Sequence, residues 1–242
     1  MSDQRLGCLH VPERFRDRFL DSVDVGAGKA IQAAQEAARR FVAGEFAALL
    51  ISGPTGIGKS LIAACVCNEL ASAANDEVTL ALSALGSSQA ELARPSLEYP
   101  TIDLEAHSAL MDRARTARAR SDRGCPRWTS VPSLLGRLRR EIGADERPAA
   151  AIVEHAMETR GLLVLDDLGA ERPTEWTAAT LFEISSERYD RMVRTIITSN
   201  LSADELDAAG YSRIVSRLAD HGALLELSTA YDYRMKLRRS AI

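Results

Sequence analysis

The sequence predicts an α/β fold in which helices cover both faces of a parallel sheet of about five strands. Three stretches carry this prediction. An apolar run from Phe46 to Ile51 leads into a glycine-rich turn, a second from Leu162 to Leu165 ends at two aspartates, and a β-branched run spans Arg194 to Asn200. Apolar runs bounded by turn residues and separated by helical patterns are typical of strands buried on both faces. The 242 residues suffice for one large domain.

The composition of the chain limits the classes of function that it could have. The net charge is −4, so contact with nucleic acid would have to come from a local basic patch. The four cysteines show no metal spacing and are expected to be reduced and structural. The histidines show no metal spacing either, and no role is assigned to them. No apolar run reaches membrane-spanning length, and the first residues lack the apolar segment of a secretion signal. We therefore expect a cytoplasmic protein with no membrane partner.

Taken in order, residues 1–28 form a polar lead-in, and residues 29–242 form the main domain. Lys29 to Val42 carries apolar residues at helical spacing and ends near Gly44, a plausible C-cap. Phe46 to Ile51 is the first strand.

The turn after this strand matches the phosphate-binding pattern G-x-x-x-x-G-K-[ST]. Glycines let the backbone N–H groups approach a polyphosphate closely, and the following helix directs its positive end at the anion. Lys59 would place its charge on the outer phosphates, and Ser60 would put its hydroxyl on Mg²⁺. The alternative is an accidental cluster of turn glycines. The predicted ATP-binding residues are Gly53, Pro54, Thr55, Gly56, Ile57, Gly58, Lys59, Ser60 and Leu61.

The next part of the chain is harder to interpret. We expect the helix after the glycine turn to end near Ala73. Val78 to Leu85 is consistent with a strand or with another helical turn, and residues 74–124 are expected to form an inserted, mostly helical or loose segment. Arg127 to Val131 then predicts a strand, Pro132 to Arg140 a helix with proline at its start, and Ala149 to Thr159 another helix.

Two carboxylates follow the apolar run that ends at Leu165. The carboxyl ends of parallel strands are where ligands bind in open α/β sheets. Asp166 would hold Mg²⁺, and Asp167 would accept a hydrogen bond from the water that attacks the γ-phosphate. The alternative is a strand that merely ends in an Asp-Asp turn. We expect the glycine turn and this aspartate pair to meet on neighbouring strand tips and form one pocket.

The remaining elements are predicted as follows. Trp176 to Asp190 is a helix, and Arg194 to Asn200 a strand whose terminal amide reaches the γ-phosphate or the water, or else starts a turn. Tyr211 to Leu218 is a helix with two arginines four residues apart, and Ala223 to Leu227 is a last short strand.

The ordered motifs GPTGIGKS, LLVLDDLGAE, TIITSN, RIVSRL and YDYR resemble the DnaC-type helicase-loader ATPases and their IstB-like relatives within the AAA+ class of P-loop NTPases. The resemblance covers roughly residues 11–72 and 125–239. The resemblance implies that Asn200 is the first sensor of the γ-phosphate, Arg217 an arginine finger that enters a neighbouring subunit's site, Arg213 its companion, and Arg234 the second-sensor arginine. The order of the elements predicts a reduced or absent C-terminal helical lid after the last strand.

Two features depart from this family. Only about ten residues precede the lead-in motif VPERF, where a domain that grips the helicase is usual, and the segment at residues 74–124 is unusually long. A basic stretch also stands out between residues 113 and 140. It is expected to contact the backbone of single-stranded DNA or to form a solubilising charged helix. Its arginines are Arg113, Arg115, Arg118, Arg120, Arg123, Arg127, Arg137, Arg139 and Arg140.

Three functions follow as hypotheses. The favoured one is an ATP- and Mg²⁺-dependent ATPase of DNA replication that binds single-stranded DNA and a replicative helicase and forms an ATP-dependent homo-oligomer. The second is a transposition-assisting ATPase that assembles on duplex DNA. The third is a P-loop small-molecule kinase or a nucleotide-gated scaffold, and the finger and sensor pattern argues against it.

Overall fold

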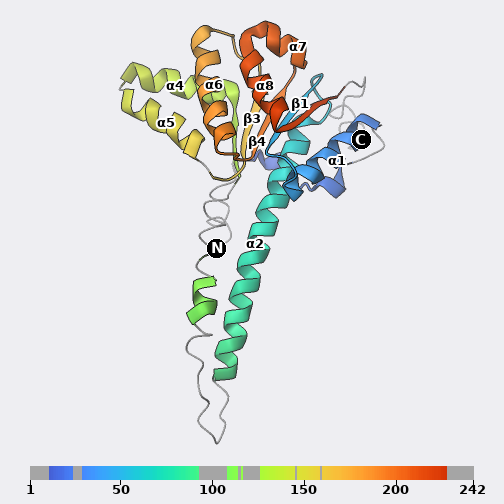
Figure 1. The fold of residues 1–242 in the computed structure, drawn as a ribbon, viewed down its shortest axis with the longest axis vertical. Coiled ribbons are helices and arrows are strands. Elements are labelled where there is room, and N and C mark those ends of the chain that lie inside the picture. Colours follow the sequence, from blue (N-terminus) through green and yellow to red (C-terminus); the bar gives the residue numbers. More distant parts are fainter. Residues whose placement is uncertain are drawn as a thin grey trace, which may run out of the picture.

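A five-stranded parallel sheet forms the centre of the molecule (Figure 1). The computed structural model describes residues 11–23, 29–92, 108–113, 116, 126–144, 146–158 and 160–227. The strand order is β2-β3-β4-β1-β5, and every pairing is parallel. The strands are β1 (Ala48–Ser52), β2 (Arg127–Ser130), β3 (Leu163–Leu168), β4 (Thr195–Ser199) and β5 (Gly222–Glu226). The predicted five-stranded parallel sheet is confirmed.

Helices cover both faces of the sheet, as predicted (Figure 1). Short 3₁₀ turns, η1 (Glu13–Phe15) and η2 (Leu20–Ser22), precede the first helix. The helices are α1 (Lys29–Ala43), α2 (Lys59–Leu92), α4 (Val131–Ala144), α5 (Glu146–Glu158), α6 (Glu175–Asp190), α7 (Ala203–Leu206) and α8 (Ser212–Asp220), and a π-helical turn, η4 (Asp207–Tyr211), joins α7 to α8.

Alternating side chains of the strands divide the core into two layers. In β1, Leu49 and Ile51 face one cluster, built with α1, the start of α2 and the lead-in. Ala48 and Leu50 face the other, built with α4, α5, α6 and α8. All five residues of β1 are buried, which explains its continuous apolar sequence.

The predicted end of α2 is wrong. The helix continues past Ala73 to Leu92, so Val78 to Leu85 is helical. Alanine, leucine and glutamate are frequent there, and the first proline after the helix begins is Pro95, so no residue forces an earlier stop. In Figure 1, α2 runs from the edge of the sheet well beyond the α/β body. At 1.5 Å per residue, its 34 residues span roughly 50 Å.

The lead-in is fastened to the body by side-chain amides. Asn68 of α2 donates to the carbonyl oxygens of Phe15 (2.8 Å) and Arg18 (2.7 Å). Gln35 of α1 donates to those of Leu20 (2.7 Å) and Val23 (3.2 Å). Because buried carbonyls need partners, these bonds hold the lead-in beside the start of α2.

Candidate functional site

The glycine turn between β1 and α2 adopts a conformation that depends on its glycines. Gly53, Gly56 and Gly58 all have positive φ angles, of 135°, 89° and 107°. At Gly53 a Cβ atom would lie 2.3 Å from the carbonyl oxygen of Leu227, so a side chain is excluded there by both backbone angle and space. The turn ends at the first residue of α2, Lys59, and so lies at the positive end of a long helix.

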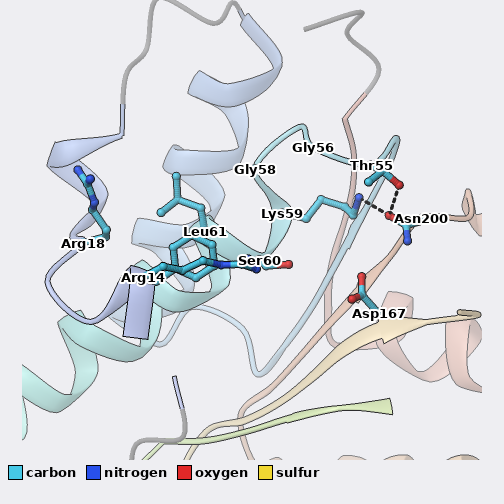
Figure 2. A pocket seen from close by; sticks show the side chains of 11 residues that line it. Arg14, Arg18, Thr55, Gly56, Gly58, Lys59, Ser60, Leu61, Asp167 and Asn200 are labelled. Carbon is cyan, nitrogen blue, oxygen red and sulfur yellow. Dashed lines mark hydrogen bonds between the residues drawn. The ribbon is translucent and has the colours of Figure 1, made fainter. Parts of the chain in front are cut away.

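Lys59 reaches back from the end of the turn to its first residues. Its side chain is buried, and its ammonium donates to the carbonyl oxygens of Gly53 (2.7 Å) and Pro54 (2.8 Å) and to Oδ1 of Asn200 (2.9 Å). Thr55 donates to the same Asn200 oxygen at 3.3 Å (Figure 2). The end of β4 is therefore tied directly to the glycine turn.

A second set of hydrogen bonds joins the start of α2 to β3. The hydroxyl of Ser60 donates to Oδ1 of Asp166 at 2.9 Å, and the hydroxyl of Thr198 donates to the same oxygen at 2.6 Å. Asp166 is 7% exposed, and its burial raises the pKa of its carboxyl. The glycine turn and the aspartate pair thus meet in one pocket, as predicted.

The two motifs do not lie on neighbouring strands, however. β4 separates β1 from β3, so the prediction of neighbouring strand tips is wrong. Thr198 of β4 bridges the gap: its hydroxyl donates to Asp166 and accepts from the backbone N–H of Asp167 at 3.0 Å. Sequence reasoning missed Thr198, because a threonine in a β-branched run is indistinguishable from an ordinary strand residue.

A strand irregularity directs Asp167 into the pocket. The register between β3 and β4 shifts between Leu165 and Leu168, and Asp167 has a φ of 62°. Such bulges re-aim side chains next to functional sites. Asp167 consequently lines the pocket next to Lys59 and Asn200 (Figure 2). Asp166 instead accepts a hydrogen bond from Ser60.

The pocket extends from the glycine turn to the lead-in. Its volume is about 340 Å³. Of the nine predicted ATP-binding residues, six line it, while Gly53 and Pro54 accept from Lys59 and Ile57 is buried in the core. The lining residues are Arg14, Phe15, Arg18, Thr55, Gly56, Gly58, Lys59, Ser60, Leu61, Asp167 and Asn200. The three lead-in residues were not predicted, since only the folded chain brings them to α2.

The donor set fits a magnesium ion shared with phosphates. The hydroxyl of Ser60, which lines the pocket, and the carboxylate of Asp166, which accepts from it, are hard oxygen ligands. Among the described residues no group of three or more His, Cys, Asp and Glu side chains gathers to bind a metal alone. Magnesium sites with one carboxylate complete their coordination with phosphate oxygens and water, so these residues suit Mg²⁺ that arrives with a nucleotide.

The two arginines of α8 lie outside this pocket. The guanidinium of Arg213 stacks on Phe182 of α6, with 3.6 Å from Cζ to the ring centroid. Arg217 lies over Phe182 and Tyr189 and is 3.4 Å from a carboxylate oxygen of Asp190, with its side chain 30% exposed. Neither arginine reaches the chain's own glycine turn. Arg234 lies outside the described residues.

Replacing Asp166 is expected to stabilise the nucleotide-free protein even though it removes a proposed Mg²⁺ ligand. A carboxyl whose pKa is higher in the folded than in the unfolded chain makes folding less favourable as the pH rises through the interval between the two values. Asp166→Asn removes the ionisable carboxyl, and with it this loss of folding stability at high pH. The asparagine keeps one oxygen that can accept hydrogen bonds from Ser60 and Thr198. We expect the nucleotide-free variant to melt about 3 °C higher than the wild type at pH 8. A lower melting temperature, measured by calorimetry, would contradict the burial argument.

Comparison with known proteins supports the fold. No protein-family model and no curated protein sequence matches the chain. Among solved structures, the DnaC helicase loader has a TM-score of 0.58 at 19% identity, covering 90% of this chain and 100% of its own. DnaI has a TM-score of 0.58 at 19% identity, covering 93% and 95%. DnaA from Aquifex aeolicus bound to AMPPCP has a TM-score of 0.59 at 16% identity, covering 96% of this chain and 56% of that one.

These similarities, the strand order and the glycine turn define the class. The chain has the fold of the AAA+ P-loop ATPases. Within that class its fold matches those of DnaC and DnaI over nearly their whole lengths, which confirms the resemblance predicted from the motifs at the level of fold.

Proposed function

We propose that this protein is an ATPase of DNA replication, of the helicase-loader type, that binds and hydrolyses ATP with Mg²⁺. The observation that carries the proposal is the convergence of Lys59, Ser60, Asp166, Asp167 and Asn200 on one pocket.

Each residue has a role that follows from its place. Lys59 now contacts neutral oxygens, and anionic phosphate oxygens would bind its ammonium more strongly. Ser60 and Asp166 would hold Mg²⁺. Asp167 would orient the attacking water, and Asn200 would hydrogen-bond to that water or to the γ-phosphate.

The placement of Arg217 favours an assembling ATPase over a small-molecule kinase. A kinase needs a lid whose arginines close over its own phosphates, whereas Arg213 and Arg217 lie on the α6–α8 face. The two arginines that line the pocket, Arg14 and Arg18, belong to the lead-in, which Asn68 holds against α2. An arginine supplied from a neighbouring subunit would neutralise transition-state charge and so make hydrolysis depend on assembly. We therefore propose an ATP-dependent homo-oligomer.

Single-stranded DNA and a ring helicase are the proposed partners. DnaC is a helicase loader, and one of the matching DnaA structures is bound to single-stranded DNA. The exposed arginines of α4, which are Arg137, Arg139 and Arg140, offer positive charge for a nucleic-acid backbone. The predicted contacts through Arg115, Arg118, Arg120 and Arg123 lie outside the described residues. Among the described residues no helix is both apolar and long enough to cross a bilayer.

The DNA proposal predicts a steep salt dependence. For single strands the slope of log affinity against log salt is about −0.7 per neutralised phosphate. Replacing Arg137 and Arg140 with alanine should reduce the slope by roughly 1.4 if each binds one phosphate. Arg39→Ala, which removes an exposed arginine paired with Asp21, serves as control. An unchanged slope would exclude α4 from the DNA site.

Two measurements test the proposed function: the rate of ATP hydrolysis and co-purification with a helicase. Wild-type ATP hydrolysis should rise more than linearly with protein concentration and should increase further with single-stranded DNA. A hexameric replicative helicase should co-purify with the ATP-bound protein. ATP turnover that rises only linearly with protein concentration and does not change when DNA is added would contradict the proposal. Assembly on duplex DNA without any helicase would instead favour the transposition-assisting alternative.

A further inference from the structure

Glu171 joins the site described above to the helix that carries the arginines. It lies four residues after Asp167, in the turn that follows β3, and is 9% exposed. Both of its carboxylate oxygens accept from the backbone N–H of Gly169, at 3.2 and 3.1 Å. One of them also accepts from the hydroxyl of Tyr211. A buried carboxylate is thus shared between two distant parts of the chain.

On one side, the carboxylate fixes the turn that presents Asp167. Asp167 and Gly169 both have positive φ angles, of 62° and 86°, and the N–H of Ala170 donates to the carbonyl oxygen of Asp167 at 3.2 Å. A Cβ atom on Gly169 would lie 2.6 Å from Leu201, so this turn is packed closely against the chain that follows Asn200. Movement of Asp167 would therefore move the N–H group that Glu171 holds.

On the other side, the carboxylate holds the start of α8. Tyr211 is 1% exposed and is the last residue of the π-helical turn η4, directly before α8. Gly210, its neighbour, has a φ of 91°, which breaks the helix between α7 and α8. Such a joint lets α8 move separately from α7, and π turns are frequent at functional sites. Burial raises the pKa of the Tyr211 phenol, which keeps its proton available for Glu171.

We propose that Glu171 and Tyr211 are positioning residues that couple the Asp167 turn of one subunit to the arginines which that subunit presents to its neighbour. This proposal rests on the proposed function, because it requires Arg217 to act across a subunit boundary. A change at Asp167 would then be transmitted through Gly169, Glu171 and Tyr211 to the start of α8. Arg213 and Arg217 follow Tyr211 by two and six residues on that helix.

A mixing experiment tests the coupling in the subunit that donates the arginine. Arg217→Ala subunits keep their pocket but lack the finger. Asp167→Asn subunits keep the finger and are expected to bind ATP, but they hydrolyse it very slowly. Their mixture on single-stranded DNA should hydrolyse ATP much faster than either variant alone. When the Asp167→Asn donor also carries Tyr211→Phe, this rescue should fall by roughly tenfold, since a hydrogen bond to a charged group has been lost.

The controls distinguish coupling from general damage. Ser185→Ala removes another buried hydroxyl, which donates to the carbonyl oxygen of Leu181 within α6, and should leave the donor's rescue unchanged. Glu171→Gln in the donor keeps one acceptor oxygen and should give an intermediate rescue. Thermal unfolding identifies any donor that fails to fold, and Glu171→Gln then serves in place of Tyr211→Phe.

The outcomes are separable. If the donor without a second substitution gives no rescue, Arg217 does not act in trans, and both the finger assignment and the coupling are overturned. If that donor rescues and the Tyr211→Phe and Glu171→Gln donors rescue equally well, the finger assignment stands and the coupling alone is overturned.

Discussion

Replacing Arg217 with alanine is expected to lower ATP turnover by roughly a thousandfold, because arginine fingers contribute about 10³–10⁵ to hydrolysis. ATP binding should remain unchanged, since Arg217 lies against Phe182, Tyr189 and Asp190 and not in its own subunit's pocket. Steady-state turnover measures the first effect, and equilibrium titration with a fluorescent ATP analogue measures the second.

The matched control for this substitution is Arg191→Ala. Arg191 lies at the end of α6, pairs with Glu187 at 2.7 Å and is 46% exposed. An exposed pair of this kind contributes at most about 1 kcal/mol to stability, so turnover should stay at the wild-type value. Arg217→Ala subunits that keep wild-type turnover would show that the finger assignment is wrong.

Replacing Asp167 with asparagine should lower turnover by roughly 10²–10⁴-fold, the range for loss of a positioned general base. The change keeps the size of the side chain, and asparagine tolerates the positive φ of this position. Because Asp166, Ser60 and Lys59 are untouched, the affinity for Mg²⁺-ATP should change little. Single-turnover measurements at saturating ATP isolate the chemical step.

Asp204→Asn is the control for this second substitution. Asp204 is an exposed aspartate in the first turn of α7, away from the residues that line the pocket. It loses the same charge and should leave the single-turnover rate unchanged. A wild-type rate in Asp167→Asn would remove Asp167 from the chemistry.

The strands and the pocket floor were predictable from the sequence because local patterns encode them. β1, β3 and β4 are short apolar or β-branched runs, and the glycine turn carries its own spacing rule. The order of the strands is not local. The sequence gives no sign that β4 lies between β1 and β3, and so the bridging role of Thr198 became visible only in the folded chain.

The lead-in and α2 show two other limits of sequence reasoning. Arg14 and Phe15 line the pocket because Asn68 holds the lead-in against α2, and a single amide on an apolar helix gives no indication of its partner. The predicted end of α2 near Ala73 is wrong, because no proline lies between that residue and Leu92 to stop the helix.

The central claim is that Lys59, Ser60 and Asp166 form one Mg²⁺-nucleotide site, and calorimetric titration of ATP in the presence and absence of Mg²⁺ tests it most directly. We predict one bound nucleotide per chain, tighter binding with Mg²⁺ than without, loss of binding in Lys59→Ala, and loss of the Mg²⁺ effect alone in Asp166→Asn. A wild-type protein that takes up no ATP, or a Lys59→Ala variant that binds ATP as the wild type does, would contradict the account.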